Sequence, residues 1–120
     1  MALALKAVVD GRPLPLKRAR TGNGRHYDPP ENVAHKERIQ WAIRWNKPLL
    51  LGPLRVVILC EFRQAKPTAD VDNLGKMVLD GLNGYVWKDD VQVMDLHVVK
   101  AGSAAVDRTV IIVETIEETE

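Results

Sequence analysis

The sequence has a single cysteine, Cys60, among its 120 residues, so no internal disulfide can form. This cysteine lies in a continuous apolar run, which predicts that its thiol is buried packing and not a nucleophile. A lone cysteine without a partner is typical of proteins that fold in a reducing cytosol. The absence of a C-x-x-C pair also excludes a dithiol redox motif.

Long apolar runs are missing as well. No stretch approaches the roughly 20 apolar residues that span a bilayer, which predicts a soluble protein with no membrane partner. The chain starts with apolar residues, but no basic segment precedes them and Asp10 soon interrupts the run. Because this start is unlike a secretory signal, we expect the protein not to be exported by that route.

Several catalytic motifs are absent from the sequence. It has no glycine-rich phosphate loop and no serine, histidine and aspartate in the order of a hydrolase triad. Its three histidines, His26, His35 and His97, lack the spacing of a zinc site such as H-E-x-x-H. We therefore expect surface or loop positions for the histidines and no small-molecule cofactor.

The size and charge of the chain are more informative. With 46% hydrophobic and 28% charged residues, a chain of 120 residues fits one compact domain, residues 1–120. Residues 1–66 carry thirteen Lys and Arg against five Asp and Glu, whereas residues 67–120 carry four against eleven. The first half is thus suited to bind phosphate and the second to bind cations, unless the halves pair in the fold and cancel.

Apolar periodicity predicts six regular elements. Strands are expected where β-branched and apolar residues concentrate, at residues 3–9, 53–62, 91–100 and 108–116. Helices are expected at residues 31–46, with Trp41 and Trp45 in the core or an interface, and at residues 72–82. We expect a hairpin of the last two strands, a frayed tail at residues 117–120, and an α+β fold with helices packed on one mixed sheet in the order β-α-β-α-β-β.

A loop rich in proline, glycine and arginine runs from Asp10 to about Pro30. Loops of about 20 residues without structure of their own are often functional. We expect its basic residues to bind a nucleic-acid backbone and an aromatic residue to stack on an exposed base. These residues are Lys17, Arg18, Arg20, Arg25 and the aromatic Tyr27.

Two pairs of aspartates stand out in the acidic half. Asp70 and Asp72 lie two residues apart where a loop enters the second helix, so an extended backbone there projects both carboxylates to one side. Asp89 and Asp90 occupy the turn before the next strand. Carboxylates and water are the ligands that Mg²⁺ prefers. The structural alternative is a helix N-cap at the first pair and a polar turn at the second.

Lys76 lies one helical turn after Asp72 and therefore on the same face. A lysine in this place can stabilise the negative charge that develops on a phosphate during cleavage. The alternative is an ordinary ion pair between the two residues. Asp80 continues this face, and we assign it to helix packing or to holding Lys76.

Taken together, residues 69–93 resemble the signature of the RusA family of Holliday-junction resolvases. That family's pattern is D-x-D-N-L-x-K-x-x-x-D-x-L, then an aromatic-flanked segment ending in D-D-x-Q-V, and every one of these positions is filled here. The first half adds G-x-P-x-P from Gly11 to Pro15 and Y-x-P from Tyr27 to Pro29. The family often has proline where this sequence has Ala69.

The resemblance implies a magnesium-dependent endonuclease that resolves four-way DNA junctions by paired nicks in recombination and repair. It implies a homodimer, since a two-fold protein offers two identical sites to strands related by the same symmetry. It also implies that Asp70, Asp72 and Asp90 bind Mg²⁺, that Lys76 is catalytic, and that Asp89 is their neighbour. Such resolvases are typical of bacteria and phages, which favours the cytoplasm of a bacterial or phage-infected cell.

Two other interpretations remain open from the sequence. In one, the chain is a non-catalytic DNA-binding module in which the basic loop of the basic half, residues 1–66, binds DNA and the aspartates of residues 67–93 only cap and turn. In the other, it is a related nuclease that cuts flaps or replication forks.

Overall fold

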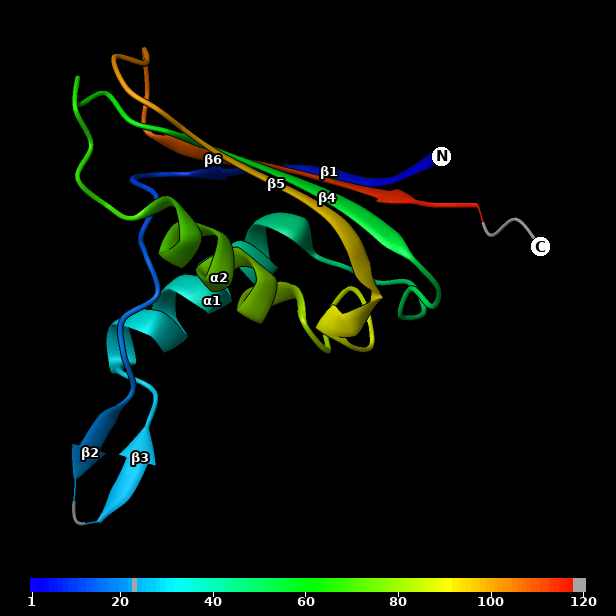
Figure 1. Ribbon diagram of the computed structural model, residues 1–120, viewed down its shortest axis with the longest axis horizontal. Helices are drawn as coiled ribbons and strands as arrows, with labels where there is room; N and C mark the ends of the chain where they lie inside the picture. Colours follow the sequence, from blue (N-terminus) through cyan, green and yellow to red (C-terminus); the bar gives the residue numbers. More distant parts are fainter. Residues whose placement is uncertain (23, 118–120) are drawn as a thin grey trace.

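The computed structural model describes residues 1–22 and 24–117, apart from the side chain of Arg20. Two helices, α1 (Pro30–Ile43) and α2 (Val71–Leu82), pack on one face of a mixed sheet (Figure 1). The strands of this sheet lie in the order β1 (Ala2–Asp10), β6 (Arg108–Thr115), β4 (Leu54–Glu61) and β5 (Val93–Ala101). The predicted α+β fold and its order β-α-β-α-β-β are confirmed.

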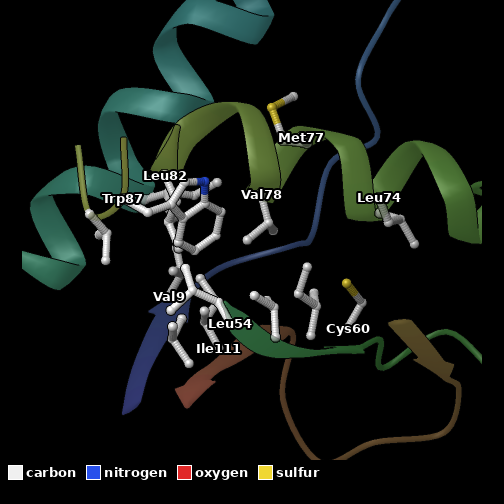
Figure 2. Packing of buried hydrophobic residues seen from close by; sticks show 14 of the residues in the cluster. Val9, Leu54, Cys60, Leu74, Met77, Val78, Leu82, Trp87 and Ile111 are labelled. Atoms are coloured by element: carbon white, nitrogen blue, oxygen red, sulfur yellow. The ribbon is translucent and has the colours of Figure 1, made fainter. Parts of the chain in front are cut away.

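The core lies between α2 and the two central strands, β4 and β6. Alternate residues of β4 are fully buried, among them Leu54, Ile58 and Cys60. Leu74 and Leu82 of α2 cover them from above, as Figure 2 shows. Cys60 is fully buried, which confirms its interpretation as packing. This burial raises the pKa of its thiol to about 11.

The predicted hairpin of the last two strands is wrong. β5 pairs in parallel with β4 at one edge of the sheet, and β6 lies between β4 and β1. Burial explains this arrangement, because Ile111 and Val113 of β6 are fully buried, as a central strand requires, while Leu96 of β5 is 43% exposed. Gly102 lets the chain cross the end of β4, since a Cβ there would lie 2.3 Å from the carbonyl oxygen of Ala65.

The long basic loop is not without structure. It contains a short antiparallel hairpin of β2 (Arg20–Gly22) and β3 (Arg25–Tyr27), which projects away from the body (Figure 1). Gly24 has a φ of +75°, a left-handed conformation that glycine adopts without strain and that lets the chain reverse there.

The buried face of α1 differs from the predicted one. Asn32, His35 and Ile39 face the core, so the expectation of a surface position for His35 is wrong. Trp41 is 70% exposed and does not belong to the core, whereas Trp45 is partly buried against it. The helix ends at Ile43, earlier than predicted, because Arg44 adopts the left-handed conformation and caps it.

The charges of the two halves partly cancel. Arg55 pairs with Glu114 at 2.6 Å and with Asp95 at 3.1 Å, each from the acidic half. Lys17 and Arg18 nevertheless remain exposed, so the basic loop keeps a positive surface.

No helix in the described part is both long and apolar enough to cross a membrane. The predicted tail falls largely on residues 118–120, which lie outside the described residues.

Candidate active site

The first acidic pair lies at the start of α2. Asp70 occupies the N-cap position with an extended backbone, but its side chain makes no capping hydrogen bond. Asp72 follows in the first turn, and both side chains are exposed. The Lys100 ammonium donates to the carbonyl of Ala69 at 2.9 Å and fixes the entry into the helix. The two carboxylates are therefore close in sequence, exposed and not used for capping.

Lys76 lies one turn further along α2, with its side chain exposed. Within the described residues it forms no ion pair with Asp72 or with Asp80, so the ordinary ion pair is not present. Asp80 instead lies 3.6 Å from the ammonium of Lys36 on α1. Of the two roles expected for Asp80, holding Lys76 is wrong, and the pair with Lys36 of α1 agrees with a role in helix packing.

The basic loop joins this end of α2. Lys17 and Arg18 line a groove of about 400 Å³ together with Asp72 and Lys76. The backbone N–H of Leu16 donates to the carbonyl of Asn73 at 2.9 Å, which attaches the loop directly to α2. Charged side chains from the basic half and from the acidic half therefore face one groove.

Asn32 holds the loop from its other side, and the sequence analysis missed it. This side chain is 1% exposed, and its oxygen accepts from the Lys17 N–H at 3.0 Å. Its amide nitrogen donates to the Lys17 carbonyl at 2.9 Å and to an Asp28 carboxylate oxygen at 2.8 Å. The sequence does hold a signal for this residue. Asn32 lies seven residues before the apolar Ile39 and so on the same face of the helix, and a polar residue on a buried face needs hydrogen-bond partners.

The second acidic pair lies at the other end of α2. Asp89 caps the 3₁₀ turn η1 (Asp90–Gln92), accepting from the N–H of Val91 at 3.0 Å. The polar-turn alternative therefore describes Asp89. Asp90 accepts from the indole N–H of Trp87 at 2.8 Å and lies near Asn83, the C-cap of α2.

The environment of Asp90 disfavours its charged form. Burial raises the pKa of this carboxyl, the hydrogen bond from Trp87 opposes the rise, and the nearby carboxylates of Asp80 and Asp89 add to it. A positive charge placed beside Asp90 would relieve this electrostatic cost.

The predicted metal ligands do not come together in one chain. Asp70 and Asp90 flank opposite ends of α2, a helix of 12 residues, or about 18 Å at 1.5 Å per residue. Figure 1 shows the start of α2 at one end of this helix and the yellow segment that contains η1 at the other. Across residues 1–22 and 24–117, no three Asp, Glu, His or Cys side chains gather closely enough to hold a metal ion.

The remaining basic residues lie on the hairpin. Arg25 and Tyr27 are exposed on β3, which projects away from α2 (Figure 1). The hydroxyl of Thr21 lies 3.2 Å from Nδ1 of His26 across the hairpin. The side chain of Arg20 lies outside the described residues. The structure thus separates the hairpin from the groove that holds Lys17 and Arg18.

An apolar groove runs along α2 beside the edge strand β5. It has a volume of about 460 Å³ and is lined by Val71, Leu79, Leu96 and Val98, together with Asp72, Gly75 and Lys76. Val71 is 41% exposed and Leu96 is 43% exposed. An apolar surface therefore adjoins the residues expected to be catalytic.

Exposed carboxylates and a lysine that face a basic loop are typical of proteins that bind and cut the phosphate backbone of nucleic acids. The family model described as Endodeoxyribonuclease RusA matches residues 10–114. The chain therefore belongs to the RusA endodeoxyribonuclease family, as residues 69–93 predicted. A comparison with curated proteins found no match.

Proposed function

We propose that the protein resolves four-way DNA junctions by magnesium-dependent paired nicks and that it acts as a homodimer. The observation that carries this proposal is the groove in which Lys17 and Arg18 of the basic loop face Asp72 and Lys76 of α2. Membership of the RusA endodeoxyribonuclease family supports the DNA substrate and the hydrolysis of its backbone.

Each charged group of the groove, and Asp70 two residues before its Asp72, has a distinct role in this proposal. Lys17 and Arg18 bind the phosphates on either side of the cut through charge, independent of base sequence. Lys76 is unpaired within the described residues, so its ammonium is available to stabilise negative charge on the scissile phosphate. Asp70 and Asp72 offer exposed carboxylate oxygens, the ligand type that Mg²⁺ prefers. A bound Mg²⁺ ion supplies Lewis-acid polarisation of the phosphate and a more acidic water.

The separation of Asp90 from the first pair supports the homodimer. The three aspartates of one chain cannot bind the same metal ion, because Asp70 and Asp90 flank opposite ends of α2. A second copy placed antiparallel along α2 brings the start of one helix near the end of the other. Such a two-fold arrangement forms two equivalent sites, each with Asp70 and Asp72 of one chain and Asp90 of the other.

The surface along α2 suits that second copy. The groove between α2 and β5 is lined mainly by apolar side chains, and Val71 and Leu96 are more than 40% exposed there. β5 is an edge strand with Met94 71% exposed, and an open apolar edge invites pairing with another chain. Covering this face buries apolar surface and joins the two halves of each site in one step.

The proposal is tested by cleavage of a labelled synthetic four-way junction with and without Mg²⁺. The wild type is expected to make paired nicks only with the metal present. Asp72→Asn is expected to bind the junction with a similar Kd but to cut it at least 100-fold more slowly. Matched flap, fork and duplex substrates determine which branched DNA is preferred.

Binding of the junction without any metal-dependent cut would contradict the proposal and indicate the non-catalytic DNA-binding module. Faster cutting of flaps or forks than of four-way junctions would keep the nuclease but change its substrate. Lys66→Ala is the matched control, because Lys66 is exposed and lines neither groove.

A further inference from the structure

A pocket lies at the end of α1, outside both grooves described above. Its volume is about 400 Å³, and three of its six lining residues are aromatic. The lining residues are Glu37, Gln40, Trp41, Arg44, Trp45 and Tyr85. The proposed cleavage reaction uses none of them.

Trp41 is the unusual residue of this pocket. Its side chain is 70% exposed on the surface of α1, which is high for the largest apolar side chain. The guanidinium of Arg44 lies over its ring, 5.3 Å from the centroid, yet most of the indole stays open. Lys47 lies similarly over Trp45, at 5.7 Å. The pocket therefore combines an open indole, that of Trp41, with one lining cation, Arg44, while Lys47 lies outside the lining on the Trp45 side.

The pocket is also fixed by hydrogen bonds. The hydroxyl of Tyr85 donates to the carbonyl of Gln40 at 3.0 Å and accepts from the backbone N–H of Trp45 at 3.0 Å. Gln40 itself donates from its side chain to the carbonyl of Gly81 at 3.0 Å. These bonds attach the end of α1 to the end of α2, so the wall formed by Tyr85 and the backbone of residues 40–45 is fixed before any ligand binds.

We infer that this pocket binds an unpaired base of branched DNA by stacking on Trp41. Aromatic rings flanked by cations recognise unpaired bases, because stacking uses the flat face that every base has. The carboxylate of Glu37 on the wall repels a phosphate but can accept from a base amino group, so the base and not the backbone is the occupant.

The position of the pocket agrees with this occupant. Tyr85 belongs to the segment that leads from the end of α2 to Asp90, and α1 ends beside the same segment. This inference rests on the proposed function, in which Asp90 contributes to the cleavage site. A base that leaves its pair near the branch point would then lie close to the cut.

The test uses a four-way junction with one unpaired 2-aminopurine beside the branch, and a fully paired duplex for comparison. Binding is measured without divalent metal by 2-aminopurine fluorescence and by titration to a Kd. The wild type is expected to quench the fluorescence, and Trp41→Ala to lose the quench and weaken the junction Kd about tenfold. Trp41→Phe should keep most of both effects, because its ring still stacks.

Val33→Ala is the matched control, since Val33 is an exposed residue of the same helix outside the pocket. Equal quenching and equal Kd in the wild type and Trp41→Ala would overturn the inference, even if both proteins still cut the junction. A wild type that neither binds nor cuts any junction would instead overturn the proposed function. Conversion of a dimer into a monomer by Trp41→Ala would identify the pocket as a protein interface and also overturn the inference.

Discussion

Two neighbouring polar side chains on the buried face of α1 differ in how their hydrogen-bonding groups are satisfied. Asn32 forms three hydrogen bonds, to the backbone of Lys17 and to Asp28. His35 is 5% exposed, and its Nδ1 has no hydrogen-bond partner within the described residues. Burial lowers the pKa of His35, and the positive charge of Arg38 lowers it further. The neutral imidazole is therefore the form that the fold favours.

The His35 environment predicts that stability falls in mild acid. The unfolded chain binds a proton to His35 near its ordinary pKa of 6.5, whereas the folded chain binds it at a lower pH. Stability from this residue is therefore complete above about pH 6.5 and decreases as the pH falls toward the lower, folded pKa. Urea unfolding of the wild type and His35→Leu between pH 7.5 and 5 should show a steeper loss for the wild type. Parallel pH curves for the two proteins would contradict the assignment.

At the scale of residues, the sequence predicted where the charged side chains lie along the chain, but not which side chains they contact. The spacing of Asp70, Asp72 and Lys76 placed them at one end of a helix, where the structure has them. The polar turn offered as the alternative for Asp89 describes a local contact with Val91. The same reasoning could not assign Asn32 to the loop, because that role depends on which side of α1 faces the core and on Lys17, a partner 15 residues away.

At the scale of elements, the close approach of α2 to β5 depends on a glycine. A Cβ added to Gly75 would lie 2.8 Å from a methyl carbon of Val98 on β5. A helix normally loses about 1 kcal/mol by having glycine in its interior. The glycine is thus explained by packing, since any larger residue would push the helix away from the edge strand.

We predict that Gly75→Ala destabilises the protein by about 1–3 kcal/mol, because overpacking outweighs the better helix propensity. Val98→Ala should recover much of the loss in the double variant, since it removes the clashing methyl groups. The measurement is the free energy of unfolding in urea for the single and double variants.

Gly81→Ala in the same helix is the matched control. A Cβ at Gly81 would lie 3.6 Å from Ile39, an ordinary contact, so this change should be neutral or stabilise by up to about 1 kcal/mol. Equal effects of the two glycine substitutions would show that helix propensity, and not contact with β5, determines the outcome.

The elements were predicted better than their pairing. All four strands of the main sheet and both helices lie within a few residues of their predicted positions. The hairpin of β5 and β6 was wrong because strand pairing depends on which strands are buried on the helix-covered face, a property of the whole sheet. The β2–β3 hairpin was missed because each strand has only three residues and no apolar alternation.

At the scale of the whole molecule, the two ends of α2 carry different parts of the proposed site. Asp72 and Lys76 face the basic loop at one end, and Asp90 lies beside Asn83 at the other. Sequence proximity and the family pattern favour one site made of Asp70, Asp72 and Asp90. A single chain does not bring these three side chains together. No signal within a single sequence shows whether two residues meet within one chain or between two copies.

Mixing two inactive variants tests the central claim, that two copies of the chain together form the DNA-cutting site. Asp72→Asn and Asp90→Asn should each fail to cut a four-way junction alone. In a co-refolded equal mixture, each heterodimer would have one site with both changes and one fully intact site. We predict that this mixture recovers magnesium-dependent cutting of the junction. Each heterodimer should nick only one of the two strands that the wild type cuts as a pair. A mixture as inactive as its components, although it forms heterodimers, would contradict the claim, because sites within single chains would each keep one damaged residue.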